Sequence, residues 1–162
     1  MKLELVDIVD KNDRVLKTIE RKLITKSDIS RSSCVIILNN KNEILLQLRS
    51  VKSERYPSFW DCSAGGIVGQ GEDYATCADR ELSEETGIKT ELKFLGKHYI
   101  ELDDGRRHFT AFFVGQYNGK TKIDPNEVTK VKFFSIETIR KMIVEKEKIH
   151  PECLFMLEKY FL

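Results

Sequence analysis

Hydrophobic and polar residues alternate near the start of the chain, which is typical of strands with one buried face. The alternation extends from Leu3 to Val9, and Val15 to Arg21 has the composition of a returning strand. Between them, Lys11, Asn12 and Asp13 are the kind of polar residues that form a tight turn. The pattern therefore predicts an N-terminal β-hairpin.

A second pair of strands is expected after a polar connection over residues 22–32. The apolar run 35–38 and the strand-like segment 44–48 are separated by residues 39–42, which are rich in asparagine. Asparagine tolerates the positive φ that tight hairpin turns require. A polar loop over 49–57 and a glycine-rich loop over 65–71 should follow this second hairpin.

The spacing of apolar residues changes to a helical period between Asp73 and Thr86, and Gly87 followed by Ile88 is typical of a helix C-terminus. Further strands are expected near 91–102, 107–117 and 131–134. The chain from Ile136 onward is helical by pattern, with a break before Pro151. This order predicts an α/β fold in the broad sense, or α+β in stricter use, with helices on the faces of a mixed sheet.

Length and charge narrow the class of protein. A chain of 162 residues suits one domain with its own core. Its 27 Lys and Arg against 26 Asp and Glu leave a formal net charge of +1, which excludes the overall basic field of a non-specific nucleic-acid binder. No apolar run approaches the ~20 residues of a membrane span, and early acidic residues argue against a signal peptide. We expect a cytoplasmic protein with no membrane partner and no stable nucleic-acid partner.

The cysteines and histidines show no metal-binding spacing. The four cysteines are widely separated, no CxxC pair occurs, and the three histidines are scattered. We therefore expect the cysteines to be reduced and buried as small hydrophobic residues.

The strongest chemical signal is a local excess of acidic residues between Gly66 and Ile88, where six acids accompany one base, Arg80. At 100° per residue, Glu81, Glu84 and Glu85 share one helical face about 100° wide. Carboxylates this close repel one another, and a hard divalent cation such as Mg²⁺ or Mn²⁺ would compensate. Glu72, near the start of the helix, is placed to reach Arg80 and fix its orientation. A solvated acidic face is the alternative reading of the three glutamates.

The spacing of these residues resembles the signature of the Nudix hydrolases. It consists of Gly66, five residues, Glu72, seven residues, and then Arg80-Glu81-Leu82-Ser83-Glu84-Glu85-Thr86-Gly87-Ile88. The strand order before and after this box is also similar to the family's α/β/α sandwich. The resemblance implies a Nudix domain over 31–162, preceded by a hairpin extension over 1–30 that covers the site, extends the sheet or forms the contact of a homodimer.

What the resemblance implies is attack of water on the diphosphate bond of a small molecule, usually a nucleoside diphosphate linked to another group. Mg²⁺, with Mn²⁺ as a substitute, would be the cofactor. The implied metal ligands are Glu81, Glu84, Glu85 and the carbonyl of Gly66. Arg80 joins the catalytic set by pairing with Glu72. The implied proton acceptor is Glu127, in the loop before the last strand, or a glutamate of the box such as Glu84.

Three basic residues are candidates for binding substrate phosphate. Arg49 ends the strand before the polar loop and is similar to a family arginine that touches phosphate. Lys52 and Arg55 lie in the loop itself and are weaker candidates.

A second resemblance concerns the branch related to isopentenyl-diphosphate isomerases, and it rests on segments 5–10, 44–49 and 59–66. Those isomerases use a cysteine and a histidine in a Ser-x-Cys-Gly-His pattern, whereas this chain reads Ser63-Ala64-Gly65-Gly66-Ile67. Cys62 comes too early to substitute, and no histidine precedes His98. Hydrolysis is therefore favoured over isomerisation, and over a non-catalytic nucleotide-binding module, because every glutamate of the box is present.

Overall fold

The computed structural model describes residues 3–162. The prediction about a signal peptide rests partly on residues 1 and 2, which lie outside this range. The described elements are, in chain order, β1 (Leu5–Val9), β2 (Val15–Glu20), the short 3₁₀ helix η1 (Arg21–Leu23), β3 (Ile29–Leu38), β4 (Ile44–Arg49), β5 (Trp60–Asp61), β6 (Ala64–Ile67), α1 (Tyr74–Thr86), β7 (Leu92–Glu101), β8 (Arg107–Gln116), β9 (Val128–Phe134), α2 (Ile136–Val144) and α3 (Pro151–Tyr160).

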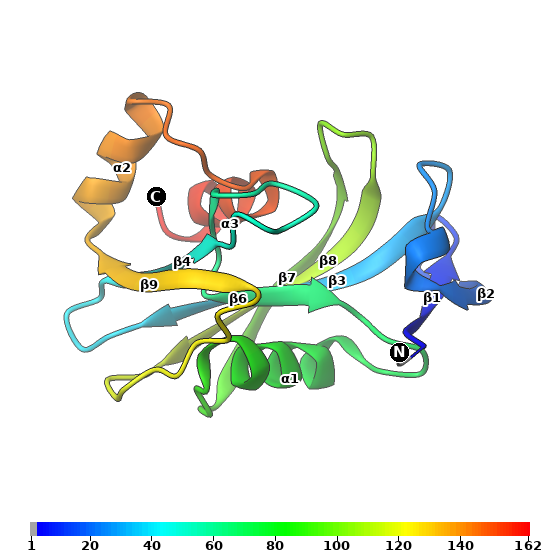
Figure 1. Ribbon diagram of the computed structural model, residues 1–162, viewed down its shortest axis with the longest axis horizontal. Helices are drawn as coiled ribbons and strands as arrows, with labels where there is room; N and C mark the ends of the chain where they lie inside the picture. The colour runs from blue at the N-terminus through cyan, green and yellow to red at the C-terminus, as the bar shows by residue number, and fades with distance from the viewer. Residues whose placement is uncertain (1–2) are drawn as a thin grey trace.

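The strands form one mixed sheet with helices on both faces, as the sequence predicts (Figure 1). β3 is the centre, and along one side it pairs in parallel with β8 from Ile29 to Leu38. Its other side pairs in turn with β1, β6 and β4, all antiparallel. α1 lies on one face, and α2 and α3 lie on the other. The two apolar cores follow this arrangement, one between the sheet and α1 and the other between the sheet and α3.

The sheet divides where the site is built. β3 and β4 pair only at Ile37↔Leu45 and Leu38↔Ile44. Beyond this point β3 continues beside β6, whereas β4 continues beside β5 and β9. The short connection from β5 to β6 therefore crosses between the two halves. Side chains of α1 and the start of α3 approach this crossing from opposite faces of the sheet.

The ends of α1 explain why the acidic helix begins and stops where it does. The Asp73 side chain accepts a hydrogen bond from the Thr76 N–H at 2.7 Å, which caps the first turn. At the other end Gly87 has φ +70°, a left-handed conformation that costs glycine little. Between these caps Cys77, Ala78 and Leu82 are buried, so the predicted helix is confirmed.

Two strands are longer than the sequence pattern predicts. β3 begins at Ile29, inside the segment 22–32 that we expected to be a polar connection. Its first half is hidden from pattern analysis because Ser30 and Ser32 are polar yet fully paired across the sheet with β8. Similarly, β9 begins at Val128, three residues before the apolar run that predicted it. Arg49 is the last residue of β4, as its assignment to the end of that strand predicts. Residues 65–67, expected in the glycine-rich loop, belong instead to β6, where they pair with β3.

The N-terminal hairpin forms as predicted and contacts the glycine-rich loop that precedes α1. Leu5 O accepts from the Gln70 N–H at 2.9 Å, and the Asp7 carboxylate accepts from the Gly71 N–H at 3.0 Å. The hairpin therefore extends the sheet and braces the approach to α1. The domain boundary at residue 30 stays a prediction. Within residues 3–162, no helix is both long and apolar enough to cross a membrane.

Candidate active site

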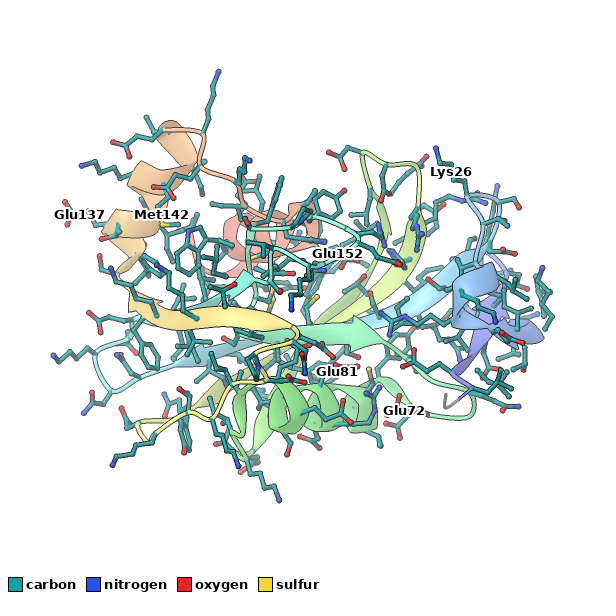
Figure 2. All side chains as sticks on the ribbon, in the orientation of Figure 1. Lys26, Glu72, Glu81, Glu137, Met142 and Glu152 are labelled. Carbon is teal, nitrogen blue, oxygen red and sulfur yellow. The ribbon has the colours of Figure 1, made fainter. Side chains whose placement is uncertain are left out.

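Two of the three helix glutamates point into the molecule. Glu81 and Glu85 lie one turn apart on α1, and their residues are only 8% and 4% exposed. Glu84 lies between them in sequence but points outward, with a side chain that is 58% exposed. Figure 2 shows Glu81 in the space between α1 and the sheet. The solvated acidic face is therefore wrong for Glu81 and Glu85 and fits only Glu84.

Gly66 makes room for the Glu81 carboxylate. A Cβ on Gly66 would lie 2.2 Å from Glu81 Oε1, so any other residue would displace the carboxylate. The glycine of the signature is thus explained by a close approach between β6 and α1. The Gly66 carbonyl oxygen accepts from the Cys77 thiol at 3.7 Å, which places it on the side of β6 that faces α1.

The environment of Glu85 disfavours its charge. Its carboxylate accepts a short hydrogen bond from the Gln47 amide, and among residues 3–162 it forms no salt bridge. Burial, followed by the neighbouring Glu81, raises the pKa of Glu85 well above its usual range. Glu127 and Asp61 contribute in the same direction, so they also lie near this carboxyl group.

The pKa of Glu81 is subject to opposing effects. Burial raises its pKa, while the Arg80 guanidinium opposes the shift. Two adjacent buried carboxylates with one nearby cation form a group that favours binding of either a proton or a metal ion.

Arg80 connects the acidic residues of the helix. Its Nε and Nη2 donate to Glu72 at 2.8 and 3.0 Å, and its Nη1 donates to Glu81 at 2.7 Å and to Glu84 at 3.3 Å. The hydrogen bonds to Glu72 contribute most to raising the pKa of Arg80, which stays charged. Although burial alone would raise the pKa of Glu72, Arg80 and the Gly69 N–H lower it.

Two of the three basic residues proposed to bind phosphate have protein partners. Arg49 donates to Asp61 at 3.0 Å and to the Arg55 carbonyl at 3.0 and 3.2 Å. Arg55 pairs with Asp104 in the turn between β7 and β8, at 2.6 Å. Lys52 is exposed and forms no salt bridge within the part of the chain that the structure describes.

Glu127 lies in an exposed loop that is fastened to the site by backbone hydrogen bonds. The Asp124 N–H donates to the Glu85 carbonyl at 3.2 Å, and the Ser50 N–H donates to the Glu127 carbonyl at 2.9 Å. The loop therefore connects the end of α1 to the start of loop 50–59. Glu127 thus follows a contact with the end of α1, not its start, and its role as the proton acceptor stays a prediction.

Gln47 and Asp61 belong to the site, although sequence reasoning did not select them. They face each other across the β4–β5 pair, and Gln47 is 4% exposed. Gln47 had a signal in the sequence, since it is the polar residue of the apolar run Ile44-Leu45-Leu46-Gln47-Leu48. Asp61 had none, because its partners depend on how β5 aligns with β4.

All four cysteines are free and buried, as predicted. Three of them, Cys34, Cys62 and Cys153, lie together although they are distant in sequence, and the Cys62 sulfur is 3.8 Å from that of Met156. Hydrogen bonding to Cys153 and burial raise the pKa of Cys62, so its thiol stays protonated. One ligand atom each from Asp61, Cys62 and Cys153 lies within 4.8 Å of the others, a convergence that spacing in the sequence does not show.

Comparisons with known proteins identify the family of the chain. The family model of the NUDIX domain matches residues 29–153, and the chain belongs to the Nudix hydrolase family. It is 31% identical over 152 residues to an uncharacterized Nudix hydrolase of Pseudomonas aeruginosa, covering 93% of this chain and 87% of that one. It is 27% identical over 154 residues to a protein of Pectobacterium atrosepticum named isopentenyl-diphosphate Delta-isomerase, covering 91% and 86%.

A solved structure shows the same fold. The crystal structure of the Deinococcus radiodurans protein DR0079 superimposes with a TM-score of 0.86, covering 98% of this chain and 100% of that one. At 18% sequence identity the likeness concerns the fold alone. The near-complete coverage includes the N-terminal hairpin, so that protein shares the overall arrangement described above.

Proposed function

We propose that this Nudix hydrolase cleaves the diphosphate bond of a nucleoside diphosphate-linked or similar small molecule, with Mg²⁺ as its cofactor and Mn²⁺ as a substitute. The observation that carries the proposal is the pair of buried carboxylates, Glu81 and Glu85. Their mutual repulsion and burial make the doubly ionised pair unfavourable unless a cation joins it. Carboxylate oxygens are the donors that Mg²⁺ and Mn²⁺ prefer.

The residues present fit such a cation. Glu81 and Glu85 would hold it from α1, the Gly66 carbonyl is a further oxygen ligand, and Glu84 can join after leaving Arg80. A bound divalent cation would neutralise charge on the diphosphate and lower the pKa of the attacking water. Arg80 acts as a positioning residue, because it holds Glu81 against Gly66 while Glu72 holds the guanidinium.

The basic residues of β4 and loop 50–59 are proposed to bind the phosphates. Lys52 is available without rearrangement, since it is exposed and unpaired within residues 3–162. Arg49 and Arg55 would contact phosphate by exchanging Asp61 and Asp104 for the ligand. Such an exchange keeps each guanidinium paired with an oxyanion of matching geometry.

Proton transfer from the attacking water needs a base that is not itself engaged with the cation. Glu127 meets this requirement, because it is exposed and lies near Glu85 on a loop fastened to α1. Glu84 is the second candidate, and it would first have to leave its ion pair with Arg80.

A screen for product release tests the proposal. The purified chain is incubated with nucleoside diphosphate sugars, dinucleoside polyphosphates, oxidised nucleotides and isopentenyl diphosphate, in Mg²⁺, in Mn²⁺ and in excess chelator. We expect release of a phosphorylated product that requires the cation and is lost with Glu85→Gln. Absence of turnover for every compound, with binding retained, would instead indicate the non-catalytic nucleotide-binding module.

Isomerisation is the alternative suggested by the name of the Pectobacterium relative. The geometry offers it little support, because Cys62 is 1% exposed, packs with Cys153 and Met156, and keeps its thiol protonated. Conversion of isopentenyl diphosphate to its allylic isomer in the same screen is the result that would favour it.

A further inference from the structure

Glu152 is a buried carboxylate that the proposed chemistry does not use. It lies in the first turn of α3 and is 8% exposed. One of its oxygens accepts from the Thr110 hydroxyl at 2.7 Å and lies 3.4 Å from Ser32 Oγ. The other oxygen has only the Cys34 thiol, at 3.9 Å. Within residues 3–162 no cation pairs with it, so most of one oxygen's hydrogen-bonding capacity is unused.

The side chains around Glu152 form a polar band on an otherwise apolar sheet face. Ser32 pairs with Thr110 and Ser30 pairs with His108 across β3 and β8, so all four side chains point toward α3. Their hydrogen bonds are short: Ser32 Oγ to Thr110 Oγ1 is 2.6 Å, and Ser30 Oγ to His108 Nδ1 is 2.6 Å. Burying polar groups costs stability unless hydrogen bonds compensate, and in this band the second oxygen of Glu152 is the weakly compensated atom.

The band extends from the neighbourhood of the proposed catalytic carboxylates toward the turn between β7 and β8. At one end Cys153, the neighbour of Glu152, has its sulfur within 4.8 Å of the Asp61 carboxylate, which in turn lies near Glu85. Figure 2 shows Glu152 and Glu81 on opposite faces of the sheet. The inner end of the band therefore reaches the crossing between β5 and β6, where the sheet divides.

The outer end, formed by Ser30 and His108, lies at the start of β8, next to the β7–β8 turn. A pocket of about 370 Å³ is lined there by Glu54, Arg55, Tyr56, Asp103 and Asp104. His108 belongs to this end of the band: burial lowers its pKa, the charges of Glu152 and Asp104 oppose the shift, and that of Arg55 supports it. The Arg55–Asp104 and Tyr56–Asp103 contacts join the loop to the β7–β8 turn above the band.

We propose that Glu152 is a specificity-determining residue whose carboxylate accepts a hydrogen bond from an amino group on the base of a nucleoside diphosphate substrate. The proposal rests on the function proposed above, and it names the class of organic group that the site selects. An ionised carboxylate only accepts hydrogen bonds, so it rewards an amino group and repels a carbonyl oxygen at the same position. The surrounding hydroxyls can orient either way and do not impose this choice.

The test compares pairs of substrates in which one base carries an amino group at a position where the other carries a carbonyl oxygen or a hydrogen. Cytidine diphosphate is compared with uridine diphosphate, and guanosine diphosphate with inosine diphosphate, each as the free diphosphate and as its glucose conjugate in Mg²⁺. For the wild-type chain we expect kcat/KM to favour the amino member of each accepted pair by at least about tenfold. Equilibrium binding in excess chelator measures the same preference without turnover.

Two variants separate recognition from a structural role. Glu152→Gln keeps the shape and can still accept from Thr110, but its amide also donates, so the amino preference should fall to about one, mainly through KM. Glu152→Asp keeps the charge at the start of α3 but withdraws it by one methylene, and it should also lose the preference. Glu158→Gln, on an exposed position of the same helix, is the matched control and should keep the wild-type ratio.

The outcomes are distinguishable. A wild-type chain that hydrolyses these compounds without an amino preference overturns the role of Glu152, and so does a preference that survives in both variants. Binding with an amino preference but no hydrolysis, here and in the wider screen, overturns the proposed function and supports Glu152. Neither binding nor hydrolysis overturns both. Thermal unfolding of each variant shows whether a lost preference reflects a lost fold.

Discussion

Asp13, in the turn of the N-terminal hairpin, binds Arg31 of β3 through both its carboxylate and its backbone carbonyl. Arg31 Nε lies 2.6 Å from Oδ1, and Arg31 Nη2 lies 2.6 Å from the carbonyl oxygen. The second carboxylate oxygen accepts from Lys97 at 2.6 Å and from the Tyr74 hydroxyl at 2.9 Å. These partners belong to β3, β7 and α1, so one turn residue fastens the hairpin to three elements of the Nudix core.

Asp13→Asn should destabilise the fold by about 2 kcal/mol, because it removes the charge that compensates a largely buried Arg31. Asparagine tolerates the φ of +60° at this position, so the backbone is not strained. Urea unfolding at pH 7 measures the change. Burial alone would raise the pKa of Asp13, but hydrogen bonds from Lys97, Arg31 and Tyr74 lower it below its usual value of 3.8.

The same interaction predicts a pH dependence. Because the folded-state pKa is lowered, the stabilisation is present above the unfolded value and is lost as pH falls through the folded one. The difference in unfolding free energy between wild type and Asp13→Asn should be constant from pH 7 to about pH 5 and should shrink below about pH 4. A difference that is the same at pH 3 would show that the charge of Asp13 contributes nothing.

Glu85→Gln should lower turnover by ~10²-fold or more, as expected for a lost ligand of the catalytic cation. The fold should survive or gain stability, since the variant removes repulsion between two buried carboxylates. Activity at saturating Mg²⁺ and the melting temperature are measured together, with Asp79→Asn as the control on an exposed position of α1. Activity within threefold of wild type would falsify the metal assignment.

The helix and the hairpins were predictable because local periodicity determines them. Tyr74 to Thr86 has a helical period with a cap at each end, and the three glutamates of the signature lie on that helix. The first half of β3 was not predictable, because Ser30 and Ser32 look like loop residues until their partners on β8 are known. No local pattern carries information about a partner that is 78 residues away.

The site was predictable in its composition and less so in its geometry. Spacing alone placed Glu81, Glu84 and Glu85 on one face, but the sheet decides which of them are buried, and only Glu81 and Glu85 face it. The ion pair between Arg49 and Asp61 depends on the alignment of β4 with β5. Such contacts between distant segments follow from the tertiary structure and leave no signature in the sequence.

Gly66→Ala and Gly65→Ala should separate activity from stability. At Gly66 the added Cβ meets the Glu81 carboxylate, the end of a flexible side chain that can move away. We therefore expect a folded protein whose turnover falls by ~10-fold or more as Glu81 is displaced. At Gly65 the added Cβ would lie 2.9 Å from the Ser33 carbonyl oxygen, so the backbone must shift and stability should fall.

Activity and urea unfolding of both glycine variants check this contrast. Equal loss of stability in the two would mean that Gly66 serves only the packing of β6. Full activity of Gly66→Ala would mean that the position of Glu81 is not critical for turnover.

Cys62→Ala should leave hydrolysis near the wild-type level, because the buried thiol faces Cys153 and Met156 and takes no part in the proposed reaction. The loss of a buried sulfur should cost about 1 kcal/mol of stability. Hydrolysis rates and the melting temperature test the two halves of this prediction. Formation of an allylic diphosphate from isopentenyl diphosphate by the wild type, and its loss in this variant, would replace hydrolysis by isomerisation as the function.

Glu127→Gln should reduce the rate at neutral pH by 10²–10⁴-fold if Glu127 accepts the proton of the attacking water. Its loop is held by hydrogen bonds of the backbone, between Asp124 and Glu85 and between Ser50 and Glu127, so the substitution should leave the loop in place. The measurement is a pH–rate profile at saturating Mg²⁺. Because hydroxide can replace a missing base, the rate of the variant should recover partly as pH rises. An unchanged profile would assign the proton transfer to Glu84 or Glu81, and Glu84→Gln would then be the variant whose profile changes.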